Sequence, residues 1–414
     1  MLSVFDLISI LLVLTAAFGW INHRFIGLPH SIGLLVMGLG ASLVLIAVEL
    51  AFPRILLYAD LAAVIRQIDF QETVLNGMLA FLLFAGALHV DLSVLRERAW
   101  TVGAMATVGV IISTAVVGVG MWLAGKALGI PVPLAWALVF GALISPTDPL
   151  AVLSVLKAVK VPKTLEIEMT GESLFNDGVG VVIFLALLAA AANADGSFGL
   201  VHIGELFVVE ALGGGLLGLV TGYAAYRAMR AIDDYAIEVL LSLALVTGTY
   251  ALAGKLHMSG PIAMVVAGLL IGNHGKRDAL SDVTQRYLFS FWTLIDDILN
   301  SVLFLLIGLE VLVLRLDPSV AWLAVLAVPL ALCARLFAVS IPVFALSASH
   351  TFVRGTIPVL TWGGLRGGIS IALALSIPEV QEKSAILAAT YAVVLFTIII
   401  QGLSLRAVAA RVVR

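Results

Sequence analysis

Long apolar stretches separated by short polar segments follow one another along all 414 residues. A helix needs roughly 20 apolar residues to cross the hydrocarbon core of a bilayer, and stretches of that order recur throughout the chain. The pattern predicts an all-α polytopic membrane protein with about 13 transmembrane helices. The predicted spans are residues 2–20, 31–52, 72–90, 100–123, 133–156, 163–192, 204–227, 236–253, 258–273, 290–313, 318–346, 355–376 and 384–405. Segments 55–68 and 276–290 are amphipathic, which is typical of helices at the membrane interface.

The basic residues in the loops predict an orientation. With the N-terminus outside, 15 of the 23 Lys and Arg residues fall in cytoplasmic segments and 6 in external ones, while Arg335 and Arg366 lie inside spans. Cytoplasmic loops of membrane proteins carry an excess of Lys and Arg. We therefore predict a multi-pass protein with its N-terminus outside and its C-terminus in the cytoplasm.

Composition narrows the class further. Hydrophobic residues make up 62% of the chain and charged residues 12%, and the mean hydropathy is +1.14. A soluble domain is about 45–50% apolar and about 25% charged, so a water-soluble globule and a disordered chain are both excluded. A net charge of −3 does not indicate nucleic-acid binding, and the single cysteine, Cys333, allows no internal disulfide. We predict one integral membrane unit, residues 1–414, without a soluble domain.

Two predicted spans are interrupted by residues that disfavour a helix. Span 5 carries Asp148 within SPTDP, and span 12 carries Arg366 within WGGLRGGIS, 218 positions later. The segments that begin at Phe81 and Phe304 resemble each other at a similar offset of 223 positions. Glycine and proline are common in ordinary membrane helices, but interruptions at matching positions of inverted halves indicate a transporter's binding site. Because the offset crosses an odd number of spans, we predict two inverted repeats.

The charged residues inside the spans are candidates for function, because they are costly in a membrane. On span 6, Ser173 and Asp177 are four residues apart and share a helix face, whereas Glu172 lies about 140° around the helix from Asp177. Ser173 and Asp177 can therefore face one ion together with Asp148 from span 5. Thr147 offers that ion a hydroxyl or a freed backbone carbonyl.

Oxygen ligands without sulfur or imidazole suit a hard cation such as Na⁺. Desolvation favours the protonated form of a carboxyl group, so a buried aspartate can exchange a proton for a cation near neutral pH. This chemistry predicts one site that holds either H⁺ or the cation. The structural alternative for Asp148 and Asp177 is an ion pair with Arg335 or Arg366.

Structural interpretations are favoured for the other charges. Glu172 is expected to pair with an arginine, which would neutralise a buried charge and hold two helices in register. Arg366, between glycines, would compensate the dipoles of the broken helices. Asp296, Asp297 and Glu310 lie near the ends of predicted spans and are expected at the interface.

Four motifs resemble one family of transporters. ESLFNDG at 172–178, SPTDP at 145–149 and WGGLRGGIS at 362–370 are similar to segments of the NhaP/NHE branch of the monovalent cation:proton antiporters, the Na⁺/H⁺ exchanger family. GALHVDL at 86–92 resembles the end of that branch's third span. The motifs occur in the family's order and cover nearly the whole chain.

The resemblance implies a fold and an activity. The fold would be two inverted repeats with crossed broken helices, arranged as a core domain and a dimerisation domain in a homodimer. Residues 72–192 would form the core-domain half with the ion site, and 290–405 the inverted half with the broken helix 355–376. The activity would be Na⁺ (or Li⁺)/H⁺ antiport for pH homeostasis in a prokaryotic inner membrane. The partners would be the cation, the proton and the lipid bilayer, with no cofactor.

The resemblance also implies residue roles. The Na⁺ ligands would be Asp148, Asp177, Ser173 and the backbone carbonyl of Thr147. Asn176 would position the crossed helices, and Glu172 would pair with Arg335. An asparagine before the key aspartate is expected in members that exchange one cation for one proton, without net charge movement.

Two features depart from the family's pattern. Many relatives carry a glutamate in the third span where this chain has Ala85, which puts an additional carboxylate near the site in doubt. The chain ends at Arg414 without the long cytoplasmic tail of animal and plant relatives, so regulation by a tail is not expected.

Other functions would use the same acids. A K⁺/H⁺ antiporter would have the same fold, and oxygen ligands alone do not decide between Na⁺ and K⁺. A cation channel would need a continuous pore and would carry current. A membrane-embedded hydrolase with Asp148 and Asp177 as paired acids would leave Ser173 and Asn176 without a role, so an enzyme is not expected.

Overall fold

The structure is a computed structural model that describes residues 3–52, 68–130, 132–148, 162–192, 200–312, 320–348 and 351–412. This described part is helical and contains no strand. Nine of its helices are long and apolar enough to cross a membrane, and two shorter apolar helices accompany them. The predicted class, an all-α polytopic membrane protein, is confirmed. The predicted interfacial segment 55–68 lies outside the described residues except for its last position.

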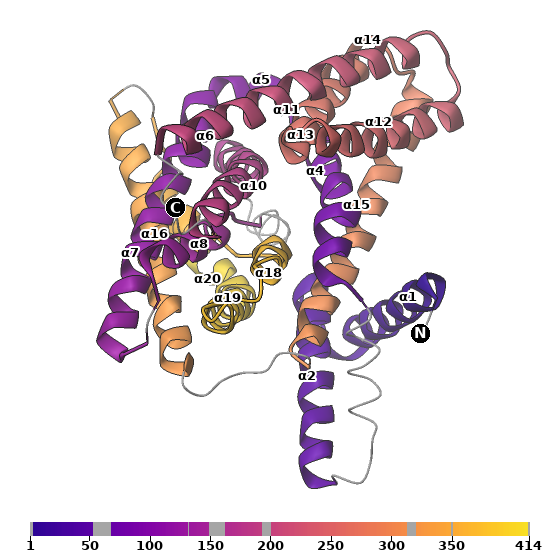
Figure 1. The fold of residues 1–414 in the computed structure, drawn as a ribbon. Helices are drawn as coiled ribbons and strands as arrows, with labels where there is room; N and C mark the ends of the chain where they lie inside the picture. Colours follow the sequence, from indigo (N-terminus) through magenta and orange to yellow (C-terminus); the bar gives the residue numbers. More distant parts are fainter. Residues whose placement is uncertain are drawn as a thin grey trace.

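One set of helices, called the panel group below, packs around α2, α13 and α15. Helix α15 lies along α2 and α4, while α13 packs against α4, α11 and α12. Figure 1 shows α2, α4 and α15 side by side, with α11 to α14 gathered near one end of them. The members are α1 (Val4–Ile21) with η1 (Asn22–Ile26), α2 (His30–Ala51), η2 (Glu72–Met78) with α4 (Leu79–Leu88), α11 (Leu200–Met229), α12 (Tyr235–Lys255), α13 (Gly260–Leu270) with η4 (Ile271–Gly275) and α14 (Lys276–Asp278), and α15 (Asp282–Glu310).

The second set, the core group, packs around α7, α8 and α16. Helix α7 contacts both α8 and α16, and α16 also packs along α19 (Figure 1). Contacts of α10 with α11 and α13, and of α18 with α15, join the core group to the panel group. The members are α6 (Ala99–Ala104), η3 (Met105–Gly109) and α7 (Val110–Leu128), then α8 (Leu134–Ile144), α10 (Lys163–Ala192), α16 (Ala321–Leu346), α17 (Thr356–Trp362), α18 (Gly368–Leu375), α19 (Lys383–Phe396), η6 (Thr397–Gln401) and α20 (Gly402–Val412); short α5 (Leu92–Glu97) leads into this group from α4.

Glycines allow α2 and α15 to approach closely. A Cβ added to Gly38 would lie 2.9 Å from the backbone oxygen of Leu305, and one added to Gly308 would lie 2.6 Å from the backbone oxygen of Leu35. The Ser42 hydroxyl donates to the carbonyl of Gly308 at 3.0 Å. Small residues and interhelical hydrogen bonds are the usual contacts between membrane helices, because lipid provides no hydrophobic force to bring the helices together.

Helix α15 begins earlier than the span predicted at 290–313. The predicted interfacial segment 276–290 is divided between α14 and the first turns of α15, which continues unbroken to Glu310. Asp296 and Asp297 therefore lie near the middle of a helix and not at the end of a span. The first turns of α15 are polar, so hydropathy alone placed the boundary too late. No glycine or proline interrupts the helix there.

Both predicted interruptions are present. Helix α8 ends at Ile144, and the chain runs on without helix to Asp148, where this described segment ends. Helix α17 ends at Trp362, and α18 begins at Gly368. The two breaks meet, since the Asp148 N–H donates to the Leu365 carbonyl at 2.8 Å. The inverted relation of the two halves stays a prediction.

Candidate functional site

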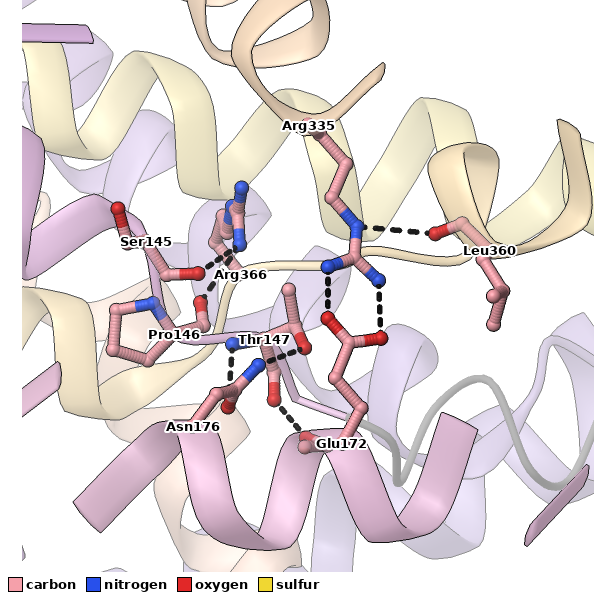
Figure 2. Close-up of polar contacts among 9 residues, drawn as sticks. Ser145, Pro146, Thr147, Glu172, Asn176, Arg335, Leu360 and Arg366 are labelled. Atoms are coloured by element: carbon pink, nitrogen blue, oxygen red, sulfur yellow. Dashed lines mark hydrogen bonds and ion pairs between the residues drawn. The ribbon is translucent and has the colours of Figure 1, made fainter. Parts of the chain in front are cut away.

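Thr147, in the break after α8, is held against α10 by three hydrogen bonds. Asn176 Nδ2 donates to Thr147 Oγ1 at 2.9 Å, and the Thr147 N–H donates to Asn176 Oδ1 at 3.3 Å (Figure 2). The Ser173 hydroxyl donates to the Thr147 carbonyl. All three residues are buried. Helix α10 thus partners the polar groups that the broken helix leaves free, as a site away from water requires.

The four residues predicted as cation ligands lie together. The Thr147 carbonyl oxygen contacts the Ser173 hydroxyl, and Asp177 follows one turn later on the same face of α10. Asp177 is 8% exposed and Asp148 is half-buried, and their carboxyl groups interact electrostatically. A Cβ added to Gly367 would lie 2.5 Å from Asp148 Oδ2, so the start of α18 covers this carboxylate. Two helix breaks and α10 therefore bring these oxygens to one place.

Arg366 lies in the break between α17 and α18. Its side chain caps α8, the helix that ends at the other break. Its Nη1 donates to the carbonyl oxygens of Ser145 and Pro146 at 2.6 and 3.0 Å (Figure 2). Its backbone N–H donates to Thr397 Oγ1 at 3.1 Å. The carbonyl end of a helix carries partial negative charge, so the buried guanidinium stabilises the end of α8. These contacts fit the predicted compensation of the broken-helix dipole, which stays a prediction.

Glu172 forms a two-point ion pair with Arg335. Arg335 Nη2 donates to Glu172 Oε2 at 2.9 Å and its Nη1 donates to Oε1, while its Nε donates to the Leu360 carbonyl at 3.1 Å (Figure 2). A Cβ added to Gly364 would meet that Nε at 2.5 Å. The pair is buried and joins α10, α16 and α17. The predicted partner of Glu172 is confirmed.

The sequence analysis overlooked one acid near this site, Glu168, and misplaced another, Asp296. Glu168 is buried, lies 3.4 Å from Arg98 and precedes Glu172 by one helical turn. The four-residue spacing from Glu172 could have identified Glu168, because residues four apart share a helix face. Asp296 of α15 interacts electrostatically with Asp148. Asp296 could have been recognised from its spacing, because it lies four residues from Trp292 and four from Asn300, and both of these residues are buried.

The chemistry of the site is that of oxygen ligands. In the part of the chain that the structure describes, no three His, Cys, Asp or Glu side chains are grouped as a metal site. Two carboxylates, a hydroxyl and a backbone carbonyl suit a hard cation that binds and leaves. The fold and the site define a polytopic helical membrane protein of the transporter class, with a buried polar site where interrupted helices meet.

Comparison with known proteins gives the family. The chain belongs to the sodium/hydrogen exchanger, transmembrane, family, whose profile matches residues 11–411. It is 46% identical to the Na⁺/H⁺ antiporter NhaP of Pseudomonas aeruginosa, covering 98% of this chain and 96% of that protein. It is 35% identical to the Na⁺/H⁺ antiporter NhaH of Halobacillus dabanensis, covering 88% and 89%. The fold matches that of the sodium proton antiporter MjNhaP1 from Methanocaldococcus jannaschii, with a TM-score of 0.76 and 20% identity over 99% of this chain and 98% of that one. The family expected from the sequence motifs is confirmed.

Proposed function

We propose that this chain is a secondary active transporter that exchanges Na⁺, or Li⁺, for H⁺ by alternating access. The observation that carries the proposal is the cluster of oxygens from Thr147, Ser173, Asp177 and Asp148, enclosed by membrane helices where two broken helices meet. Relatives that align with most of this chain are named Na⁺/H⁺ antiporters.

Competition between Na⁺ and H⁺ for Asp177 and Asp148 would couple the two fluxes. A carboxylate that is buried without a counterion is strongly disfavoured, so Asp177 needs either a bound cation or a proton before the site crosses the membrane. Because both ligands neutralise the same group, the site carries one or the other. Each transport cycle would then return a proton for every cation moved.

We expect this exchange to be electroneutral, with one cation for one proton. Asn176 stands directly before Asp177 and is neutral, and both ends of its amide are used by Thr147. This position therefore adds hydrogen bonds to the site and no third carboxylate. The charge on the site would be the same in the loaded and the protonated state.

Alternating access would be a movement of the core group against the panel group. The candidate ligands lie on core elements, α10 and the break after α8. On the panel side, α11 and α13 contact α10, and α15 contacts α18. We expect the panel group to form the dimerisation domain of a homodimer in a prokaryotic inner membrane, with the N-terminus outside. No cofactor besides the transported ions is expected.

Proton flux in proteoliposomes tests the proposal. A pH-sensitive dye would report flux after addition of Na⁺, Li⁺ or K⁺, with and without a voltage clamp by valinomycin. Flux driven by Na⁺ or Li⁺ and indifferent to the clamp supports electroneutral antiport. A larger response to K⁺ would indicate a K⁺/H⁺ antiporter, and flux that needs the clamp would contradict one-for-one exchange. Current without coupled proton flux would indicate a channel.

Asp177→Asn is expected to reduce exchange to the level of empty liposomes, because the neutral amide cannot hold a proton or balance a cation. Asp148→Asn is expected to do the same or nearly so. The matched control is Glu166→Gln, which removes a carboxylate from the first turn of the same helix and should leave flux unchanged. Exchange by a folded Asp177→Asn protein would refute the mechanism of competition at one site.

A further inference from the structure

Asp296 and Asn300, on panel helix α15, form a pair of polar side chains beside the site. Asn300 Nδ2 donates to Asp296 Oδ1 at 3.0 Å and to the Asp296 carbonyl at 2.8 Å. Asp296 is partly buried and Asn300 is only 5% exposed. The other end of the Asn300 amide, Oδ1, is buried without a hydrogen-bond partner. A buried acceptor without a donor is costly, and a cation would satisfy it.

Asp296 and Asn300 lie on the side of α15 that faces the core group, where the two helix breaks meet. Asn300 and Leu303 are three residues apart and share a helix face with Asp296. A Cβ added to Gly368 would lie 2.8 Å from Leu303 Cγ, and one added to the preceding Gly367 would lie 2.5 Å from Asp148 Oδ2. The start of α18 thus touches α15 on one side and Asp148 on the other. The neighbouring Asp297 carries the nearest like charge to Asp296, and the charge of Asp148 also acts on it.

The two buried arginines described near the site have other partners. Arg366 caps α8 through the carbonyls of Ser145 and Pro146, and Arg335 pairs with Glu172. Among the described residues, no Lys or Arg forms an ion pair with Asp296. Asp296 and the unsatisfied amide oxygen of Asn300 therefore lie together on α15 beside Asp148, in surroundings of low polarity where a cation would be attracted strongly.

We propose that Asp296 and Asn300 form a second station for the transported monovalent cation, on the panel side of the site and opposite Asp148. The inference rests on the proposed antiport function. It adds a ligand set from the panel group, whereas all the residues predicted from the sequence come from the core group. Asp296 would raise the affinity for the cation without being the group that exchanges it for a proton.

The test is the dependence of proton flux on Na⁺ concentration. Asp296→Asn keeps the size of the side chain and an acceptor for Asn300, and it is expected to raise the apparent KM for Na⁺ about fivefold or more while the maximal rate changes less than about twofold. The comparison variant is Asp297→Asn, which removes an exposed carboxylate from the next position of α15. Because Asp297 acts on Asp296 only through its charge, this variant should change the KM much less than Asp296→Asn. Asn300→Asp adds a carboxylate to the station and is expected to lower the KM. Equal KM values for Asp296→Asn and Asp297→Asn would overturn the station.

A second measurement, the shift of Tm that Na⁺ causes, can be made on variants that do not transport. Na⁺ is expected to raise the Tm of the purified wild-type protein. At the same Na⁺ concentration the shift should be clearly smaller for Asp296→Asn and nearly complete for Asp297→Asn. An inactive Asp296→Asn protein with the full Na⁺-induced shift would also overturn the station. Wild-type protein without cation-dependent proton flux would refute the proposed function instead, and the Tm shifts of the two variants would still decide whether Asp296 binds the cation.

Discussion

At Glu172 the carboxylate of α10 meets the guanidinium of Arg335, one residue away from the candidate ligand Ser173. Neighbouring polar residues of one helix thus have different tasks, because successive positions point about 100° apart around the axis. Glu172 faces α16 and α17, where its charge is neutralised. Ser173 and Asp177 face the break after α8. Burial alone does not separate these roles, since all three side chains are buried.

Glu172→Gln is expected to lower the stability of the protein. It would leave the guanidinium of Arg335 buried without its counterion, and breaking such a pair costs on the order of 3–5 kcal/mol. Thermal unfolding of the purified protein would measure the effect. Glu379→Gln is the control, because its ion pair with Lys383 has a glutamate side chain that is 92% exposed, and such pairs contribute little. Unfolding of Glu172→Gln at the wild-type temperature would argue against a structural pair.

At the scale of elements, the distance between helices depends on where small residues fall. Helix α2 carries Gly38 at its contact with α15 and Gly40 two positions later, where an added Cβ would meet nothing within 4 Å. The same residue type is therefore required at one position and replaceable at the other. The α2–α15 contact matters for function, because α15 carries the proposed second cation station.

Gly38→Ala is expected to destabilise the protein by roughly 1–3 kcal/mol, the usual effect of overpacking a tight contact. The added methyl group would lie 2.9 Å from the backbone oxygen of Leu305, which cannot move without shifting α15. Gly40→Ala should be neutral or slightly stabilising, since alanine is the better helix former. Comparison of the Tm values of the two variants measures the difference. Equal values would show that α2 and α15 are not held at this contact.

At the scale of the whole molecule, α10 and the interrupted helices of the core group hold the candidate ligands, and α15 of the panel group brings Asp296 to the same place. The helix breaks make this meeting possible, because continuous helices would bury all their backbone groups and offer no free carbonyl to an ion. The predicted orientation of the molecule depends only on the distribution of Lys and Arg in the loops.

Cysteine labelling tests this orientation. In a Cys333→Ser background, Arg230→Cys lies after α11 on the predicted cytoplasmic side and Lys255→Cys at the end of α12 on the predicted external side. A membrane-impermeant maleimide should label Lys255→Cys in intact right-side-out vesicles and Arg230→Cys only after permeabilisation. Both positions are exposed, so each serves as the control for the other. The opposite labelling would invert the assigned topology.

The class, the places of the helix breaks and the residues around Asp148 and Asp177 were all predictable from the amino-acid sequence. These features are local: apolar length, helix-disfavouring residues and the spacing along α10 are all properties of short segments. The resemblance to known motifs added the pairing of Glu172 with Arg335.

Contacts between side chains that are distant in sequence could be identified from the folded structure alone. Asp296 looked interfacial because the polar first turns of α15 shifted its predicted boundary, and Glu168 was overlooked because its partner, Arg98, lies far away in sequence. The contact of Arg366 with the end of α8 joins residues more than 200 positions apart. Such contacts depend on how helices pack within the core group and between it and the panel group, and helix packing is set by side chains from several segments at once.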